Sequence, residues 1–265
     1  MSYSQYQADL EIAIRVADAA RSAIAPYFRQ ALQVENKLAG GFDPVTAADR
    51  ASEMAMRAVL AELAPDDGIL GEELPDQPSR NGRQWVLDPI DGTRAFIAGL
   101  PTWTVLIALS ENRRPRIGLI DQPHIGERFT GWPGGASYSR GGQSLPISTR
   151  KTALLADAIL ATTDAFLFQG AEWQAFDGLR QAVRLSRYGY DAYAYAMLAQ
   201  GGVDLVVESA LQPYDVQALI PVVQGAGGVI TNWRGGDCSG GGQVLAAAHP
   251  GLHAEALAWL RAAAL

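Results

Sequence analysis

Two aspartates that follow a short apolar run constrain this chain more than any other feature. The run 85–87 predicts a strand, and it is followed directly by Asp88-Pro89-Ile90-Asp91-Gly92-Thr93. Two carboxylates three residues apart at a strand end can face each other, and like charges at short range disfavour joint ionisation unless a cation lies between them. Such oxygen ligands suit Mg²⁺ or Mn²⁺, and Gly92 and Thr93 offer N–H groups and a hydroxyl to a phosphate. This segment alone leaves open a solvated Asp-Gly turn in which Asp88 is a cap.

Further acids stand at the ends of other predicted elements. Glu72 and Glu73 follow the short apolar run 69–70, at a second strand end. Asp49 lies three residues after Thr46, in the pattern of a capping box that opens a helix, and Asp215 opens a helix further along the chain. Each of these acids also has a simple structural interpretation, as part of a surface loop or as a helix cap.

Composition narrows the class of protein. The 265 residues carry 28 acidic and 21 basic side chains, a formal net charge of −7, which argues against a nucleic-acid partner. The single cysteine excludes a disulfide framework and a Cys-rich zinc site. No apolar run has the length and freedom from charge of a signal peptide or a membrane span, so we expect a cytoplasmic protein without a membrane partner. The chain has neither a Gly-x-Ser-x-Gly turn nor a Walker A pattern, which disfavours a serine hydrolase and a P-loop nucleotide site.

Apolar periodicity predicts two layered halves, an α+β half over about 1–150 and an α/β half over about 151–265. In the first half it predicts helices over 5–30 and 46–63 and a largely antiparallel sheet from strands 69–70, 85–87, 103–109, 116–120 and 127–131, with a hairpin at 140–143. In the second half it predicts strands over 158–161, 203–207, 229–231 and 244–247, and helices over 171–183, 191–200 and 214–226 and from 252 onward.

The acidic segments, taken in order, resemble the inositol monophosphatase family. The segments are Asp43-Pro-Val-Thr-Ala-Ala-Asp49, Gly71-Glu72-Glu73, the hexapeptide 88–93 and Tyr214-Asp215, and the resemblance runs from the first helix to the last strand. It implies one phosphatase domain over 1–265 with a layered αβαβα sandwich, usually a homodimer, in which the first half carries most metal ligands and the second half carries substrate specificity.

The same resemblance implies a Mg²⁺-dependent phosphatase for phosphate monoesters, with Mn²⁺ as a possible substitute. It implies that Glu72, Asp88 and the Ile90 carbonyl hold one ion, and that Asp88, Asp91 and Asp215 hold a second. Glu72 would reach a third, weaker ion through water, Asp49 and Thr93 would orient the attacking water, and Gly92 and Thr93 would bind the phosphate. Lys37 corresponds to a basic residue near the active site of the family, although the loop spacing differs by one residue.

The second half resembles the histidinol-phosphate phosphatase branch of the family, through the segments 186–195, 202–208 and 211–215. This resemblance implies L-histidinol phosphate as the substrate, with contacts from Arg187, Tyr190, Asp191 and Glu208. Histidinol phosphate carries an ammonium group and an imidazole that can be protonated, so an acid at position 191 beside Glu208 supplies a charge-assisted partner.

Alternatives remain for these residues. Asp191 is also a candidate helix cap, and the neighbouring tyrosines are candidate core or dimer-contact residues. Glu208 matches a substrate position of inositol phosphatases as well. A phosphatase for inositol 1-phosphate or a broad range of sugar phosphates is therefore the alternative function, and a non-catalytic metal-binding regulator is a more distant one.

Overall fold

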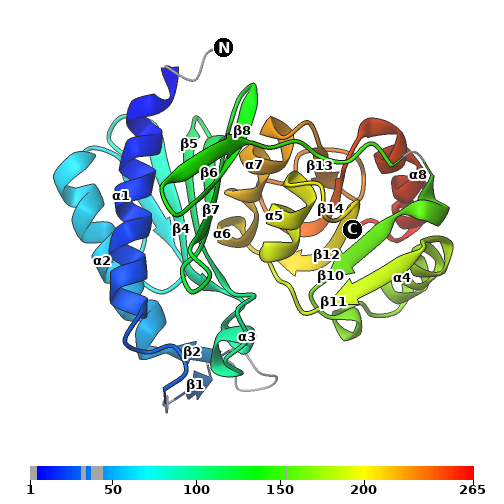
Figure 1. The fold of residues 1–265 in the computed structure, drawn as a ribbon, viewed down its shortest axis with the longest axis horizontal. Helices are drawn as coiled ribbons and strands as arrows, with labels where there is room; N and C mark the ends of the chain where they lie inside the picture. The colour runs from blue at the N-terminus through cyan, green and yellow to red at the C-terminus, as the bar shows by residue number, and fades with distance from the viewer. Residues whose placement is uncertain (1–4, 31–33, 37–43, 153) are drawn as a thin grey trace.

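Five alternating layers of helix and sheet make up the computed structural model, which describes residues 5–30, 34–36, 44–152 and 154–265 (Figure 1). The first layer is α1 (Gln7–Ile24) and α2 (Ala47–Leu63), which cover one face of a seven-stranded sheet. The helices α5 (Tyr193–Ala199), α6 (Pro213–Val216) and α7 (Leu219–Gly225) contact its other face and separate it from a five-stranded sheet, whose outer side carries α4 (Ala171–Ala182) and α8 (Pro250–Leu260). This arrangement confirms the predicted αβαβα sandwich.

The two sheets differ in their strand directions. The first follows chain order and is antiparallel except at β3–β4, with strands β3 (Gly68–Gly71), β4 (Arg83–Asp91), β5 (Thr104–Glu111), β6 (Arg114–Gln122), β7 (Glu127–Trp132), β8 (Gly135–Arg140) and β9 (Gln143–Pro146). The second is mixed, in the order β11 (Leu185–Tyr188), β10 (Ile159–Thr162), β12 (Leu205–Leu211), β14 (Gly242–Ala247) and β13 (Val229–Asn232). A small ribbon of β1 (Val34–Asn36) and β2 (Pro44–Thr46) leads into α2, and the short helix α3 (Thr93–Ile97) follows β4.

Three predicted boundaries near prolines are wrong. The first helix ends at Ile24 instead of continuing to residue 30, since Pro26 has no N–H to extend it. The predicted helix 214–226 is divided into α6 and α7, because Pro221 cannot donate to the carbonyl of Gln217. The strand expected to end before Pro89 instead continues to Asp91 after a register shift.

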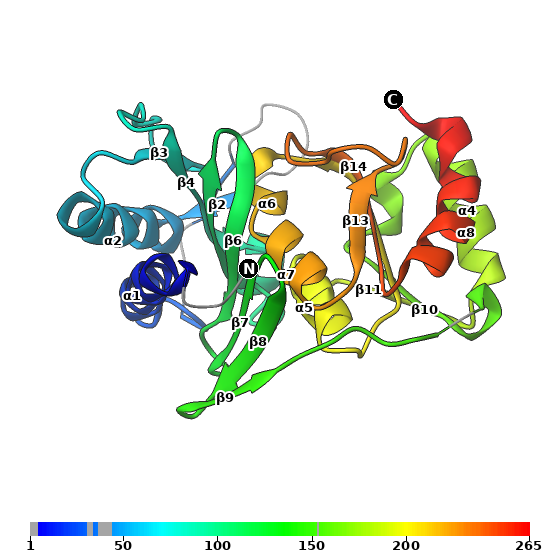
Figure 2. The ribbon, with the colours of Figure 1, turned by 90° about the horizontal axis from the view of Figure 1, so that it is seen from above.

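The middle helices lie between the two sheets (Figure 2). Their side chains are buried against both sheets. A single cluster contains Val86 and Leu106 of the first sheet, Val206 and Ala246 of the second, and Val222 of α7, each at most 1% exposed. The sheets are therefore fixed relative to each other by a shared core. Within the described ranges no helix combines the length and the apolar character that crossing a bilayer requires.

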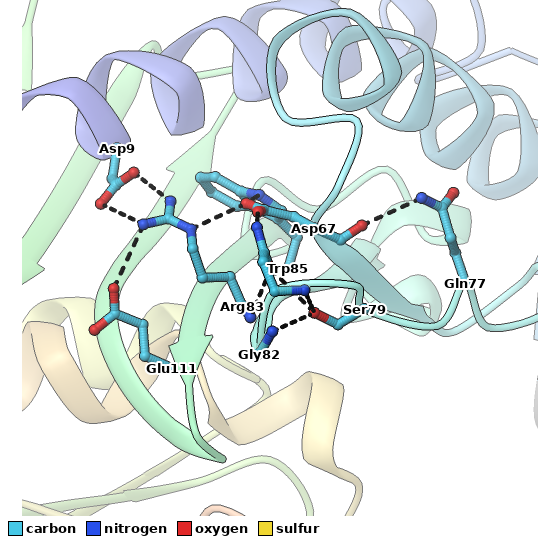
Figure 3. Close-up of polar contacts among 9 residues, drawn as sticks. Asp9, Asp67, Gln77, Ser79, Gly82, Arg83, Trp85 and Glu111 are labelled. Carbon is cyan, nitrogen blue, oxygen red and sulfur yellow. Dashed lines mark hydrogen bonds and ion pairs between the residues drawn. The ribbon is translucent and has the colours of Figure 1, made fainter.

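A cluster of ion pairs ties α1 to the edge of the first sheet (Figure 3). The Arg83 guanidinium contacts the carboxylates of Asp9 on α1, Asp67 before β3 and Glu111 at the end of β5. Asp67 is 4% exposed and also accepts a hydrogen bond of 2.8 Å from the indole N–H of Trp85. Arg83 thus neutralises a buried carboxylate and joins three segments that are far apart in the sequence.

We expect Arg83→Met to lower the free energy of unfolding by about 2 kcal/mol, because it leaves the buried carboxylate of Asp67 without its cation. Urea unfolding measures this loss. Arg80→Met is the matched control, since the Arg80–Asp66 pair spans 3.6 Å with side chains 79% and 66% exposed, and it should cost less than about 0.5 kcal/mol. Equal losses in both variants would contradict a special role for Arg83.

Candidate active site

The Asp88 and Asp91 carboxylates come from a bulge at the end of β4. Asp88 pairs with Leu106 and Asp91 with Thr104, and the register shifts between the two pairs. Pro89 has no N–H for the ladder, so the chain bulges there instead of ending the strand. The N–H of Ile90 donates to Asp88 Oδ1 at 3.1 Å. The sequence thus predicted the proximity of these two acids correctly, although it missed how the backbone achieves it.

Asp215 reaches the same place from the second half of the chain. It lies in the first turn of α6, where its Oδ2 accepts the N–H of Gln212 at 2.7 Å in a capping box. α6 packs against β4, and Asp88, Asp91 and Asp215 each offer a carboxylate oxygen within 4.8 Å of the others. Asp215 is therefore not the N-cap itself, which is Gln212, but the N3 residue of the capping box, and its carboxylate also belongs to the acidic cluster.

Glu72 approaches from the neighbouring strand. β3 lies parallel to β4, so Glu72, which follows β3, stands at the same sheet edge as Asp88. The two side chains are hydrogen-bonded to each other. Burial raises the pKa of Asp88 well above its usual range, and the nearby charges of Glu72, Asp91 and Asp215 raise it further.

Asp91, like Asp88, lies among other acids that raise its pKa. Burial raises the pKa of Asp91 well above its usual range, and Asp191 and Asp215 add to the effect, while the N–H of Ala192, 2.7 Å from Asp91 Oδ2, opposes it. Clustered carboxylates with these raised pKa values are stabilised in their ionised form by a cation. All the ligands are oxygens, which fits a hard divalent ion such as Mg²⁺ or Mn²⁺.

A buried glutamate of α2 fixes the loop that carries Glu72. Glu53 is fully buried, and its carboxylate accepts the N–H of Glu73 at 2.8 Å and the Nε–H of Arg57 at 2.8 Å. Arg57 in turn donates to the carbonyls of Leu74 and Pro75, at 3.1 and 3.0 Å. Gly71 permits this contact, because a Cβ there would lie 2.0 Å from Glu53 Oε1.

The residues predicted to orient water are held by hydrogen bonds of their own. Thr93 Oγ1 donates to the Ile90 carbonyl at 3.1 Å. Asp49 is 1% exposed, and its Oδ2 accepts from the N–H and the hydroxyl of Thr46, at 2.8 and 2.7 Å. The predicted capping box is confirmed, and β2, which precedes α2, contacts α3, which begins at Thr93. Lys37 and Asp43 lie outside the described residues.

A cavity of about 280 Å³ opens beside the acidic cluster. Its lining includes Asp91 to Arg94 at the end of β4, Asp191, Ala192 and Tyr195 around the start of α5, Glu208 to Leu211 at the end of β12, and Asp215. Gly92 has a positive φ of 81°, and a Cβ on it would lie 3.0 Å from the Asp191 carboxyl group. The predicted phosphate-binding turn and Asp191 therefore lie face to face.

Two of the four predicted substrate residues line this cavity, Asp191 and Glu208. Burial raises the pKa of Asp191 to about 6, and the charge of Arg94 opposes the shift. Burial raises the pKa of Glu208 to about 8, against the hydrogen bonds donated by the N–H and hydroxyl of Thr163, at 2.7 and 3.0 Å. Both groups are therefore acids whose charge changes near neutral pH.

The other two predicted substrate residues, Arg187 and Tyr190, are not among the described residues that line the cavity. Arg187 is exposed on β11, a strand that the sequence analysis missed, and its guanidinium lies 3.3 Å from the Tyr190 hydroxyl. The structure also brings Arg94, Thr163 and Tyr195 into the cavity lining, which the sequence analysis did not anticipate. Arg94 directly follows the hexapeptide, so its position in the sequence was an available signal.

The family model and the relatives that match this chain point to the same family. Residues 5–264 match the family model described as the inositol monophosphatase family. The histidinol-phosphatase of Mycobacterium tuberculosis is 35% identical over 259 residues, which cover 96% of this chain and 98% of that protein. The chloroplastic bifunctional phosphatase IMPL2 of Arabidopsis thaliana is 43% identical over 222 residues, 83% of this chain, and the chain spans only 63% of the plant protein.

A solved structure of an inositol monophosphatase from Zymomonas mobilis is similar over nearly the whole chain. It has a TM-score of 0.85 and 42% sequence identity, and the match covers 98% of this chain and 99% of that chain. The relatives thus share one fold, while their names divide between histidinol phosphate and inositol phosphate.

We expect Asp88→Asn to stabilise the metal-free protein and to remove its stabilisation by Mg²⁺. A carboxyl with a raised folded-state pKa binds a proton that the unfolded state releases above pH about 4, so the metal-free fold loses stability as pH rises. Removing one charge relieves this loss, and the Tm in EDTA at pH 8 should rise by about 3 °C, with a smaller rise at pH 5. Asp157→Asn, at an exposed position, should change neither the Tm in EDTA nor the stabilisation by Mg²⁺. A lower Tm in EDTA would contradict the repulsion argument.

We expect Glu53→Gln to raise the Mg²⁺ concentration for half-maximal activity about tenfold, because the loop that carries Glu72 loses its anchor. The rate at saturating Mg²⁺ should stay near that of the unaltered protein, and Mn²⁺ titration calorimetry should show the same loss of affinity. Glu62→Gln, exposed on the same helix, is the control. An unchanged metal affinity in Glu53→Gln would contradict the positioning role.

Proposed function

The chain belongs to the inositol monophosphatase family of phosphatases, and on this premise we propose that it hydrolyses L-histidinol phosphate to L-histidinol and phosphate with Mg²⁺ as its metal. The names of its histidinol-phosphatase relatives support a place in histidine biosynthesis. A homodimer and a cytoplasmic location belong to the same proposal.

The observation that carries this proposal is a pair of acids that line the cavity in addition to the acids of the metal cluster. Asp191 and Glu208 line the same cavity as Asp91 and Asp215, and Asp191 lies beside Asp91. A phosphate ester bound at the cluster would direct its alcohol toward these two acids. A charged amine or imidazolium satisfies them by charge-assisted hydrogen bonds, whereas a neutral polyol offers no positive charge to the pair.

Residues of the chain divide the work of hydrolysis in this proposal. Glu72, Asp88 and the Ile90 carbonyl would hold one Mg²⁺, Asp88, Asp91 and Asp215 would hold a second, and Glu72 would contribute to a third, weaker one. Bound Mg²⁺ lowers the pKa of water and offsets the charge of the phosphate. Asp49 and the Thr93 hydroxyl orient the water for attack on phosphorus. The N–H groups of Gly92 and Thr93 bind the phosphate oxygens.

A phosphate-release assay with Mg²⁺ tests the substrate, comparing L-histidinol phosphate, inositol 1-phosphate and an aryl phosphate. We expect kcat/KM for histidinol phosphate to exceed that for inositol 1-phosphate by at least about tenfold, because a charge-assisted contact contributes about 1.5–3 kcal/mol. Faster release from inositol 1-phosphate would favour the alternative, which the 42% identity to an inositol monophosphatase supports.

Asp191→Asn tests the cation contact. It should lower the ratio of kcat/KM for histidinol phosphate to that for the aryl phosphate about tenfold, while Asp157→Asn leaves the ratio unchanged. Because the pKa of Asp191 is raised to about 6 and that of Glu208 to about 8, their carboxylates are ionised only above these values. The ratio should therefore rise from pH 5 to pH 8, and less steeply in Asp191→Asn. Equal losses of kcat/KM for both substrates in Asp191→Asn would contradict a contact between Asp191 and the substrate cation.

A further inference from the structure

Tyr195, a residue of the cavity lining, carries a buried hydroxyl. Tyr195 lies on α5, is 1% exposed and is among the residues that line the cavity. Its hydroxyl has no hydrogen-bond partner in the part of the chain that the structure describes. Tyr193, on the same helix, differs in this respect, because its hydroxyl donates to Glu127 at 2.6 Å.

Several acids line the same cavity as Tyr195. Burial raises the pKa of Tyr195 well above its usual range, and the charges of Glu208, Asp91 and Asp215 add to that effect. The nearby thiol of Cys238 is also neutral, since burial raises its pKa to about 12. The phenol is therefore protonated at neutral pH, and it can donate one hydrogen bond and accept another.

A buried hydroxyl without a partner is costly, and the cost is recovered when a ligand supplies the partner. A site of this kind discriminates strongly, because an analogue that lacks the matching polar group leaves the hydroxyl unpaired. The position of Tyr195 thus favours a role in choosing the alcohol part of the substrate.

We infer that the Tyr195 hydroxyl is a specificity-determining contact that hydrogen-bonds the nitrogen-bearing end of a phosphorylated amino alcohol, next to Glu208. The inference rests on the proposed function and adds a residue to it. In this contact the phenol oxygen accepts an N–H of the ligand. Of the acids whose charges act on the phenol, Glu208 is not among the proposed metal ligands, so its carboxylate favours the N–H of a cation at this position over the hydroxyl of a neutral polyol.

Tyr195→Phe removes this hydroxyl and keeps the ring. The ratio of kcat/KM for L-histidinol phosphate to that for an aryl phosphate should fall at least about tenfold, mainly through a higher KM, since the contact involves a part of the substrate remote from phosphorus. The Tm in EDTA should be unchanged or higher, because an unpaired buried hydroxyl has been removed. L-Histidinol, the product, should raise the Tm of the variant less than that of the unaltered protein.

Tyr193→Phe is the matched control and should show the opposite pattern. It loses a hydrogen bond to Glu127, so its Tm should fall by a few degrees, while the substrate ratio stays unchanged. An unchanged ratio in Tyr195→Phe, or equal losses on both substrates, would overturn the inference. An unaltered protein that releases phosphate from the aryl ester but not from histidinol phosphate would instead overturn the proposed function, and the inference with it.

Discussion

Repulsion among clustered carboxylates is the constraint on which this structure depends. Asp88, Asp91 and Asp215 lie within 4.8 Å of one another, and Glu72 is hydrogen-bonded to Asp88. No single segment could hold such a cluster, since adjacent acids on one flexible loop would separate into water. Here a strand bulge, a parallel neighbouring strand and a helix start each contribute one side of the cluster. The shared core between the two sheets keeps them together, so packing energy opposes electrostatic repulsion at the site.

The support extends beyond the residues that would touch a metal. Glu53 is buried in α2, and its carboxylate accepts a hydrogen bond from the N–H of Glu73, the residue after Glu72. Arg57 neutralises Glu53 and binds the next two carbonyls of the same loop. The first helical layer therefore determines where a ligand of the cluster lies. A loop fixed in this way binds an ion without a further loss of conformational freedom, which is the advantage of a preorganised site.

The sequence predicted correctly those features of the site that depend on residues close together in the chain. The strand end at the hexapeptide and the capping box of Thr46 and Asp49 follow from local patterns and are present in the structure. The order of layers, which the family resemblance implied, is present as well. The sequence was insufficient where tertiary contacts decide. The register shift at Pro89, the position of Arg187 on an outer strand and the cavity-lining hydroxyl of Tyr195 depend on what packs opposite each residue. An apolar helix pattern predicts that Tyr195 is buried, but it carries no information about a partner for its hydroxyl.

In the proposed function, one strained residue links metal binding to substrate choice. Asp191 has a positive φ of 45°, a conformation that costs about 1 kcal/mol or more for a residue other than glycine. This conformation directs the N–H of Ala192 to Asp91 Oδ2 and places the Asp191 carboxyl against Gly92. The loop thus contacts a metal-cluster acid and the phosphate turn at the same time. A ligand cation that binds Asp191 and shifts it would also change the hydrogen bond from Ala192 to Asp91. Binding of the alcohol part of the substrate and binding at the acidic cluster are therefore expected to affect each other. In the proposed function, this geometry makes Asp191 a link between the alcohol part of the substrate and the acidic cluster.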